Sequence, residues 1–398
     1  MIVERDKKKA GRKAQQFSLS RYQPPDFGRP PLSTAPTARF VGAAQDGVVP
    51  DGFHATSNFP EYVQIRSGTW VLAPESRMDC VLVRRGRAVA VVEPRRIKRG
   101  DAVAVGRSED GSEGIFVHTD GFASGKGART DKFAFRTRGT RETPFSLSYD
   151  ALYEVLRHER DHGHIVWVLG PAVAFDKDSR DAMQALIEAG YCHALLAGNA
   201  LVTHDIEAGR FRTGLGQDIY TRSLVPHGHY HHLDILNMVR RSGSILRAMA
   251  ELRIKDGIVW ACLKRRVPIV MAGSIRDDGP MPGVIANVYE AQDAMRVHAR
   301  KATTVIAMAT QLHAIATGNM TPSYRIMDDG RVRPVYFYVV DMSEFSTDKL
   351  ANRGSTQAAA ILTNVQDFVV NLWHNLAERH GKRHTSEQAA SGNKRRTR

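Results

Sequence analysis

The chain has 398 residues, of which 42% are hydrophobic and 25% are charged, a composition typical of globular proteins. Its length predicts two domains, or three. No run of about 18 apolar residues occurs, and the charged N-terminus lacks the apolar core of a secretory signal, so we expect neither a membrane span nor export. Its three cysteines form no CxxC pair and no disulfide framework, which favours a cytoplasmic protein.

The net charge of +14 is concentrated at the two ends of the chain. Residues 1–21 and residues 378–398 each hold seven Lys or Arg and two acidic residues, so only +4 remains for the rest. We interpret both ends as basic, disordered tails, because their composition cannot build a core. No nucleic-acid-binding motif accompanies them, so we expect no specific nucleic-acid partner. A non-enzymatic protein whose tails bind RNA or another anion is the alternative.

Residues 22–147 are predicted to form an extended segment followed by a small β-rich domain. The segment up to about residue 58 is rich in Pro and Gly, which favours extended chain on the surface. From Tyr62 to about Phe135, short alternating apolar runs are separated by turn residues, as in antiparallel strands.

Residues 148–377 are predicted to form an α/β domain with a doubly wound, Rossmann-like parallel sheet. Continuous apolar strands alternate here with amphipathic helices, the pattern of strands buried on both faces. One helix is expected over residues 244–266, and another is expected to open at residues 352–357. The five expected strands lie within 164–173, 192–200, 267–274, 303–310 and 332–341.

Small or polar residues follow most of these strands. Gly170, Gly198 and Gly273 would let helix N-termini and backbone amides approach a phosphate, and Asp341 at a strand end suits a ribose diol. Ligands in such sheets bind outside the carboxyl ends of the strands, so this edge is a candidate nucleotide site. A strict GxGxxG pattern is absent.

Four histidines lie within six residues, at His227, His229, His231 and His232. Three interpretations are open: a polar loop with local hydrogen bonds, acid–base or substrate contact, and a metal site. If the segment is extended, alternation places His227, His229 and His231 on one side. No HExxH pattern occurs, and we predict no metal.

Two further clusters carry candidate chemistry. Asp205 and Glu207 follow the second strand and could act as bases or could cap a helix. In the segment GSIRDDGP, Arg276 could pair with a substrate carboxylate, and the adjacent Asp277 and Asp278 could couple electrostatically. A turn stabilised by the aspartates is the alternative there.

Long segments in this half resemble the archaeal and cyanobacterial type of ornithine cyclodeaminase, which contains a LOR/SDH-type domain. They include LLAGNALVTHDIEA, GHYHHLDILNMVRRSGSI, VPIVMAGSIRDDGPMPGVIANVYEAQDAMR and ATQLHAIATGN, and the resemblance covers about residues 160–375. The resemblance implies a tightly bound NAD and the conversion of L-ornithine to L-proline with release of ammonia. No arginine-dihydrolase module of the cyanobacterial type is present, so arginine is not an expected substrate.

The resemblance also implies a set of NAD contacts. They are Asn199, Ala200, Asp278, Thr310, Gln311, Leu312, His313, Asp341, Asn364 and Val365. Gln311 and Asn364 depart from the usual family pattern, and residues 324–334 resemble an insertion.

For catalysis we expect His229, His232 and Asp205 to handle protons, and Arg276 to bind the substrate carboxylate. The side-chain amine of the substrate must be neutral to attack the oxidised Cα, which calls for such a base. We expect a small-molecule amino-acid substrate and a homo-oligomer. Two other enzymes are alternatives: a related NAD-dependent amino-acid or amine oxidoreductase, and a zinc hydrolase built on the histidines.

Overall fold

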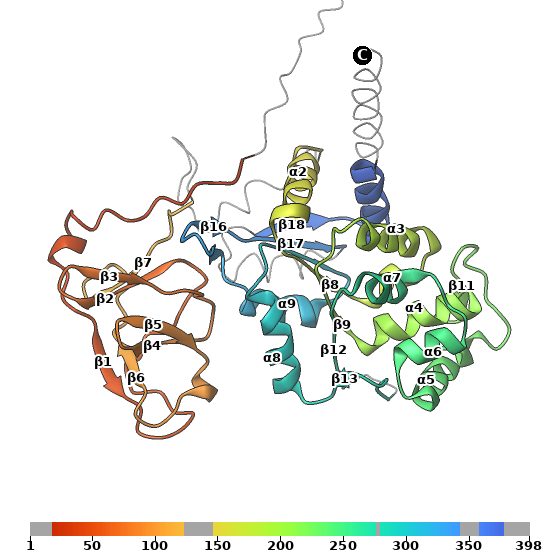
Figure 1. Cartoon of the computed structure of the whole chain (residues 1–398), viewed down its shortest axis with the longest axis horizontal. Helices are drawn as coiled ribbons and strands as arrows, with labels where there is room; N and C mark the ends of the chain where they lie inside the picture. The colour runs from red at the N-terminus through yellow and green to blue at the C-terminus, as the bar shows by residue number, and fades with distance from the viewer. Residues whose placement is uncertain (1–17, 123–145, 276–278, 343–357, 378–398) are drawn as a thin grey trace, which may run out of the picture.

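A computed structural model describes residues 18–122, 146–275, 279–342 and 358–377. A β-rich region lies on one side of a larger α/β region, and helices surround the central sheet of the latter (Figure 1). Of the two predicted basic tails, residues 1–17 and 378–398 lie outside the described residues, whereas residues 18–21 are described. Within those residues, no helix is long and apolar enough to cross a membrane.

The β-rich region contains two antiparallel sheets, as the alternating sequence pattern predicts. Buried side chains of both sheets form its core, in which Val63, Leu82 and Ile115 are fully buried. The first sheet has the order β1 (Arg39–Gly42), β6 (Ala102–Val105), β4 (Val81–Arg85) and β5 (Ala88–Val92), and the second has β3 (Thr69–Leu72), β2 (Glu61–Arg66) and β7 (Ile115–Val117). Strand β1 lies in the segment that was expected to be extended on the surface, and it pairs with β6.

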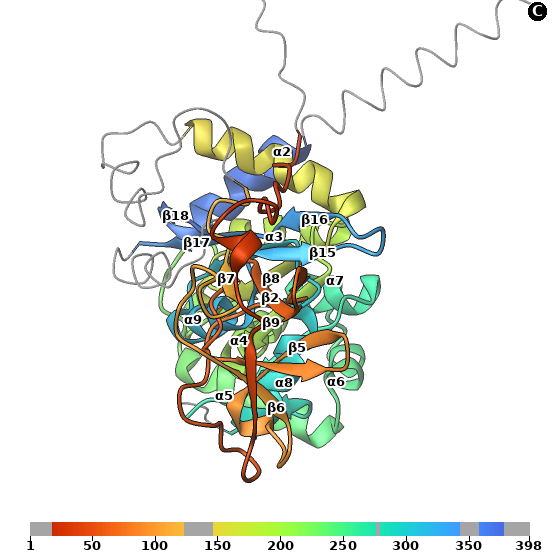
Figure 2. The same cartoon turned by 90° about the vertical axis from the view of Figure 1, so that its left-hand side faces the viewer.

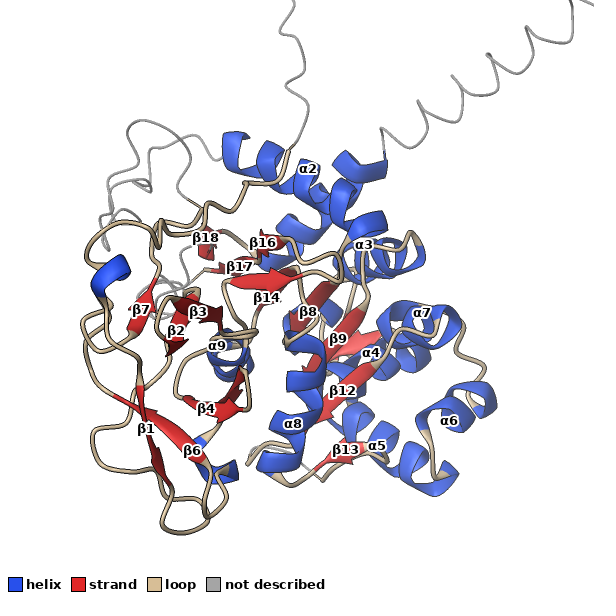
Figure 3. Ribbon diagram, turned by 60° about the vertical axis from the view of Figure 1, so that its left-hand side comes forward, coloured by secondary structure: helices blue, strands red, loops and turns tan. Residues whose placement is uncertain are grey.

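The α/β region is built on seven parallel strands, which confirms the predicted Rossmann-like doubly wound sheet. All five expected strands are present, as β8, β9, β12, β14 and β17. The strand order is β13 (Val284–Ile285), β12 (Ile269–Ala272), β9 (Ala194–Gly198), β8 (Ile165–Leu169), β14 (Thr304–Met308), β17 (Tyr336–Asp341) and β18 (Ala358–Leu362). Figure 3 shows these strands as the central layer.

One helix prediction differs from the structure, and a second lies outside the described residues. The helix expected over residues 244–266 is broken into α6 (Ile245–Glu251) and α7 (Gly257–Arg265). Arg253 after α6 and Gly257 at the start of α7 adopt positive φ values of 58° and 93°. The helix expected to open at residues 352–357 falls outside the described residues, and the next residues form strand β18 instead of a helix. The alanines of β18 favour a helix locally, but parallel pairing with β17 overrides that preference.

Helices cover both faces of the sheet, because alternate strand residues face opposite layers. On one face, Trp167, Leu169 and Ile306 pack with α2 (Ser146–His162), α3 (Lys177–Glu188), α7 and residues 365–377. Val166 and Val168 pack with α8 (Val288–Ala299) and α9 (Gln311–Met320) on the other. The remaining helices have the bounds α4 (Asn199–Phe211) and α5 (His231–Ser242).

The two regions contact each other through charged and polar groups. Glu93 of the β-rich region lies 2.7 Å from Nη2 of Arg77 and 2.8 Å from Nε of Arg296 on α8. Tyr324 is fully buried and its hydroxyl accepts a hydrogen bond from the amide of Ser76, at 3.2 Å. The view from the side of the β-rich region shows its strands in front of α8 and α9 (Figure 2).

Three histidines stack at the amino edge of the parallel sheet. The His164 ring lies 5.5 Å from that of His193 and 6.4 Å from that of His298, measured between centroids. Nδ1 of His193 accepts the amide N–H of Ile165 at 2.8 Å, so that nitrogen carries no proton. Burial, with His193, His298, Arg325 and Lys301 nearby, lowers the pKa of His164 to about 4.

This stack predicts a loss of stability in mild acid. The folded pKa of His164 lies below its unfolded value, so between about pH 6.5 and pH 4 the unfolded chain binds more protons and folding weakens as the pH falls. For this partly buried group we expect a loss of about 1–2 kcal/mol at pH 5 relative to pH 7.5. Urea unfolding of His164→Gln at both pH values should show a smaller loss than wild type. The variant of the exposed His229, His229→Gln, is the control, and an unchanged pH dependence in His164→Gln would contradict this account.

Candidate active site at the carboxyl edge of the parallel sheet

The order of the strands reverses between β8 and β14. From β8 the chain continues to α3, which packs on one face of the sheet, whereas from β14 it continues to α9 on the opposite face. Connections that leave neighbouring strands toward opposite faces open a crevice at their carboxyl ends, where open α/β sheets bind ligands. The candidate site therefore lies between Gly170 and Thr310.

The ends of these two strands approach closely. A Cβ built on Gly170 would lie 1.8 Å from the carbonyl oxygen of Ala309, so only glycine fits there. Ala309 itself has a φ of 55°, a left-handed conformation that costs energy for a residue with a side chain. Such strain is often found where backbone is held for function.

Two helices point their N-termini at this edge. Helix α4 follows β9 directly with Gly198 as its N-cap, and α9 follows β14 with Thr310 as its N-cap. Gly198 has no side chain that could cap α4, and among the described residues the Thr310 side chain makes no cap hydrogen bond to α9. First-turn amides without such a cap, together with the helix dipole, favour binding of an anion such as a phosphate.

His313 connects the two helix starts. It lies in the first turn of α9, and its Cε1 is 3.1 Å from the position of a Cβ built on Gly198. The predicted cofactor residues Thr310 and Gln311 begin the same helix, and Gln311 is exposed. Leu312 follows it within α9, and Ala200 is exposed in the first turn of α4. The fold thus brings this part of the predicted set together.

Asn199 forms hydrogen bonds with the backbone of Gly279 and Met281 at the same edge. Its side chain is buried, its Oδ1 accepts the amide of Met281 at 3.1 Å, and its Nδ2 donates to the carbonyl of Gly279 at 3.3 Å. Asn199 therefore anchors the end of the GSIRDDGP segment to the start of α4. Arg276 and Asp278, both predicted site residues, lie in that segment but outside the described residues.

The remaining predicted cofactor residues follow the outer strands. Asp341 ends β17 and is partly buried. Oδ1 of Asn364 accepts the amides of Gln366 and Asp367, at 2.8 and 3.2 Å, and so caps the helical residues 365–377. Val365 is buried in the core beneath them. The geometry thus gives Asn364 and Val365 structural contacts of their own.

Asp205, predicted to handle protons, is fully buried and engaged in structural contacts. Oδ1 accepts Nε of Arg180 at 2.7 Å, and the two carboxylate oxygens accept the amides of Ile258 and Val259 at 3.1 and 2.8 Å. It therefore caps α7 and neutralises Arg180. Burial would lower the pKa of Arg180, but Asp205 and Asp256 outweigh it and raise that pKa. This geometry favours a structural role for Asp205.

His204 and Glu207 on α4 have the geometry of a base held in position by a carboxylate. The sequence had predicted proton handling for Asp205 and not for this pair. Nδ1 of His204 lies 2.7 Å from Oε2 of Glu207, which is fully buried. Oε1 of Glu207 accepts a hydrogen bond from the hydroxyl of Thr213 at 2.8 Å. The hydroxyl oxygen of Thr213 also lies 2.8 Å from Nδ1 of His231. Because a carboxylate only accepts, Nδ1 of His204 donates and its Nε2 is left as the acceptor. The i, i+3 spacing of His204 and Glu207 is the signal in the sequence.

The histidine-rich segment is helical, so the conditional expectation of an extended strand does not apply. Residues Gly228–Tyr230 form a 3₁₀ turn, and α5 begins at His231. His229 is exposed, whereas His232 is partly buried with its ring centroid 6.0 Å from that of His204. Among the described residues, no group of three His, Cys, Asp or Glu side chains is placed to hold a metal ion.

The fold and this edge define a Rossmann-type nucleotide-binding protein. Residues 151–372 match the family model described as arginine dihydrolase ArgZ-like, C-terminal, Rossmann fold. An ornithine cyclodeaminase of Methanopyrus kandleri is 39% identical over 87% of this chain and 80% of its own length. The chain belongs to the family of these archaeal-type ornithine cyclodeaminases.

Solved structures agree with this assignment. A conserved LOR/SDH protein of Methanococcus maripaludis, 32% identical, superposes with a TM-score of 0.77 over 87% of this chain and 99% of its own. AgrE in a ternary complex with ornithine and NAD⁺ is 29% identical with a TM-score of 0.53, and the match covers 86% of this chain. That match spans 46% of the AgrE chain.

Proposed function

We propose that the protein is an NAD-dependent ornithine cyclodeaminase, which converts L-ornithine to L-proline and ammonia. The observation that carries the proposal is the reversal of strand order between β8 and β14, with the N-termini of α4 and α9 at the same edge, in a chain of this family. The complex of AgrE with ornithine and NAD⁺ supports both ligands.

The residues at the carboxyl edge fit a dinucleotide. The N-termini of α4 and α9 suit phosphates, the carboxylate of Asp341 suits a ribose diol, and Gly198 keeps the space beside His313 free of a side chain. When bound, NAD⁺ supplies a reversible acceptor for the hydride of the substrate Cα. The proposed contacts are Asn199, Ala200, Asp278, Thr310, Gln311, Leu312, His313, Asp341, Asn364 and Val365.

Proton handling falls to imidazoles near this edge. The substrate amine must lose a proton before it can attack, and Nε2 of His204 can accept one while Glu207 holds the ring and stabilises its charge. His204 lies against Phe175, which follows the loop after β8, and near His232. We keep His229 and His232 as further candidates, and we assign the substrate carboxylate to Arg276 because a guanidinium pairs bidentately with it.

The setting of the reaction is part of the proposal. The described cysteines Cys80, Cys192 and Cys262 are free and buried, which supports a reducing cytoplasm. Exposed apolar side chains on and before α5 and α6 support assembly as a homo-oligomer, among them Leu215, Tyr220, Leu224 and Leu246.

The test is incubation of the purified protein with L-ornithine and NAD⁺, followed by mass measurement of proline and ammonia. Proline formed without net NADH accumulation is the expected result. If no proline forms but denaturation releases NAD, the cofactor assignment holds and the substrate is another amino acid or amine. Neither proline nor NAD would overturn the proposal.

Variants of the proton-handling groups are expected to separate their roles. We expect His204→Gln to lower kcat by about 100-fold, and Glu207→Gln by about tenfold, because the latter removes only the charge that orients and stabilises the imidazole. The KM for ornithine should change little in Glu207→Gln, whose side chain is buried. The kcat of His229→Gln and of His232→Gln, measured in the same assay, shows how much each of these two candidates contributes. Wild-type turnover in His204→Gln would remove His204 from the mechanism.

A further inference from the structure

A cavity lies at the amino edge of the parallel sheet, opposite the candidate active site. Its volume is about 1040 Å³, and three segments that are distant in the sequence line it together with Tyr62 of β2. These are residues Leu19–Pro24, the C-terminal end of α2, and the hairpin of β15 (Tyr324–Ile326) and β16 (Val332–Pro334). Nothing in the proposed cyclodeaminase reaction uses this cavity.

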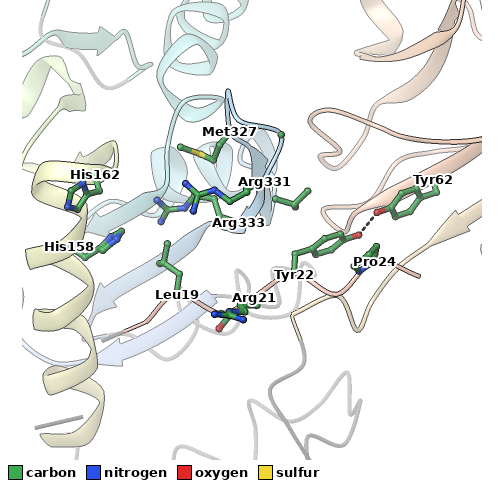
Figure 4. A pocket seen from close by; sticks show the side chains of 13 residues that line it. Leu19, Arg21, Tyr22, Pro24, Tyr62, His158, His162, Met327, Arg331 and Arg333 are labelled. Carbon is green, nitrogen blue, oxygen red and sulfur yellow. Dashed lines mark hydrogen bonds between the residues drawn. The ribbon is translucent and has the colours of Figure 1, made fainter. Parts of the chain in front are cut away.

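The walls of the cavity are basic. Among the described residues, its lining includes Arg21, Arg331 and Arg333, with His158 and His162, and contains no acidic side chain. Figure 4 shows His158 and His162 on α2, on the other side of the cavity from Arg331 and Arg333. A concave surface lined by one sign of charge concentrates ligands of the opposite sign.

In the part of the chain that the structure describes, two carboxylates pair with these cations. Asp329 pairs with Arg331 at 2.6 Å, and Arg331 is 83% exposed, so this pair is held loosely. Glu159 is fully buried behind the wall, and its Oε1 is shared by Nη2 of Arg333 at 2.6 Å and Nδ1 of His158 at 2.8 Å. The three arginines thus exceed the two adjacent acids by one charge.

Arg333 is held in place for binding. It is 6% exposed, and its Nε has no hydrogen-bond partner among the described residues. Thr303 also donates to Glu159, so the carboxylate that anchors Arg333 is fixed from several sides. The guanidinium of Arg333 is therefore held in a fixed position at the cavity wall, where its positive charge favours an acidic ligand.

The other part of the lining is apolar and aromatic. Tyr22 and Tyr62 are joined through their hydroxyls at 2.8 Å, and Leu19, Met327 and Val332 complete this part. Ligand sites combine such surface with a few polar groups that fix orientation. The two parts together suit a molecule with an acidic group at one end and an apolar body at the other.

We propose that this cavity binds a small organic anion, in which Arg21, Arg331 and Arg333 hold a phosphate or carboxylate and the tyrosine side holds an aromatic or aliphatic body. Guanidinium groups pair bidentately with either acid. Because the cavity lies at the opposite edge of the sheet from the candidate active site, its ligand is separate from the substrate and from NAD.

Calorimetric titration of the full-length protein with phenyl phosphate, phenylacetate and inorganic phosphate tests the proposal. We expect at least one of the two aromatic acids to bind with a Kd below about 10 mM, more tightly than inorganic phosphate, and more weakly as salt is added. If phenyl phosphate binds more tightly than phenylacetate, the acidic group is a phosphate, and the reverse order indicates a carboxylate. No turnover is measured, so the result does not depend on the proposed cyclodeaminase activity.

Two exposed arginines of the cavity allow variants without loss of the fold. Arg21→Ala and Arg331→Ala should each weaken binding by about 5- to 10-fold. Arg29→Ala is the matched control, since Arg29 is also 83% exposed and also pairs with a nearby aspartate, Asp26, but lies outside the cavity. Binding by neither aromatic acid, equal weakening in the control, or equal affinity for inorganic phosphate would overturn the proposal.

Discussion

Replacing Asp205 by alanine is expected to destabilise the protein by about 3–5 kcal/mol, because it leaves a buried arginine without its main partner. Arg180 is 2% exposed, and its second acidic contact, Oδ1 of Asp256, is at 3.1 Å from Nη2. The amides of Ile258 and Val259 would also lose the acceptor that starts α7. Urea unfolding at pH 7.5 measures the loss.

Two companion variants make the Asp205 result informative about function. Asp178→Ala removes an exposed acid from the first turn of α3 and should cost about 0.5 kcal/mol. Asp205→Asn keeps the shape and part of the hydrogen bonding, so the folded fraction should retain its kcat. An Asp205→Asn protein with wild-type stability and no turnover would instead support the proton-handling role predicted from the sequence.

Replacing Gly170 by alanine is expected to damage both stability and cofactor binding. The added Cβ would lie 1.8 Å from the carbonyl oxygen of Ala309 and 2.5 Å from its carbon, so the ends of β8 and β14 must separate. Backbone conformation is no obstacle, since Gly170 has a φ of −87°, which alanine adopts freely. Forced repacking of this kind costs about 2–4 kcal/mol.

The same variant should weaken NAD⁺ binding by at least about tenfold in calorimetric titration, because it widens the crevice between the two strand ends. Gly42→Ala is the control. Gly42 also lies in a strand, and a Cβ built there meets nothing within 4 Å. If Gly170→Ala matched Gly42→Ala in stability and in NAD⁺ affinity, the cofactor would not bind between β8 and β14.

The parallel sheet was predictable because its signal is local. A strand buried on both faces must be apolar along its whole length, and β8, β9 and β14 are continuous apolar runs that end in small or polar residues. The same logic predicted that Thr310, Gln311 and Asp341 lie at one edge. Strand β18 was missed because alanines carry no strand signal and its pairing with β17 supplies the stability.

The chemistry of individual charged residues was not predictable in the same way. Asp205 and Glu207 lie two positions apart on α4, yet one neutralises Arg180 and the other orients His204. Their partners Arg180, Ile258 and Thr213 come from other elements, and the sequence separation reaches 53 residues. A carboxylate's role depends on which donors the fold brings to it.

The sequence by itself determined the fold class and the family, because hydrophobic periodicity and long shared segments are properties of the chain alone. It also determined which strand ends carry the small residues that a nucleotide requires. Only the tertiary structure decided that β8 and β14 are neighbours, which acid is structural and which orients a base, and that a basic cavity lies at the opposite edge. These features depend on contacts between segments that are distant in the sequence, and such contacts form and contribute free energy only when the chain folds.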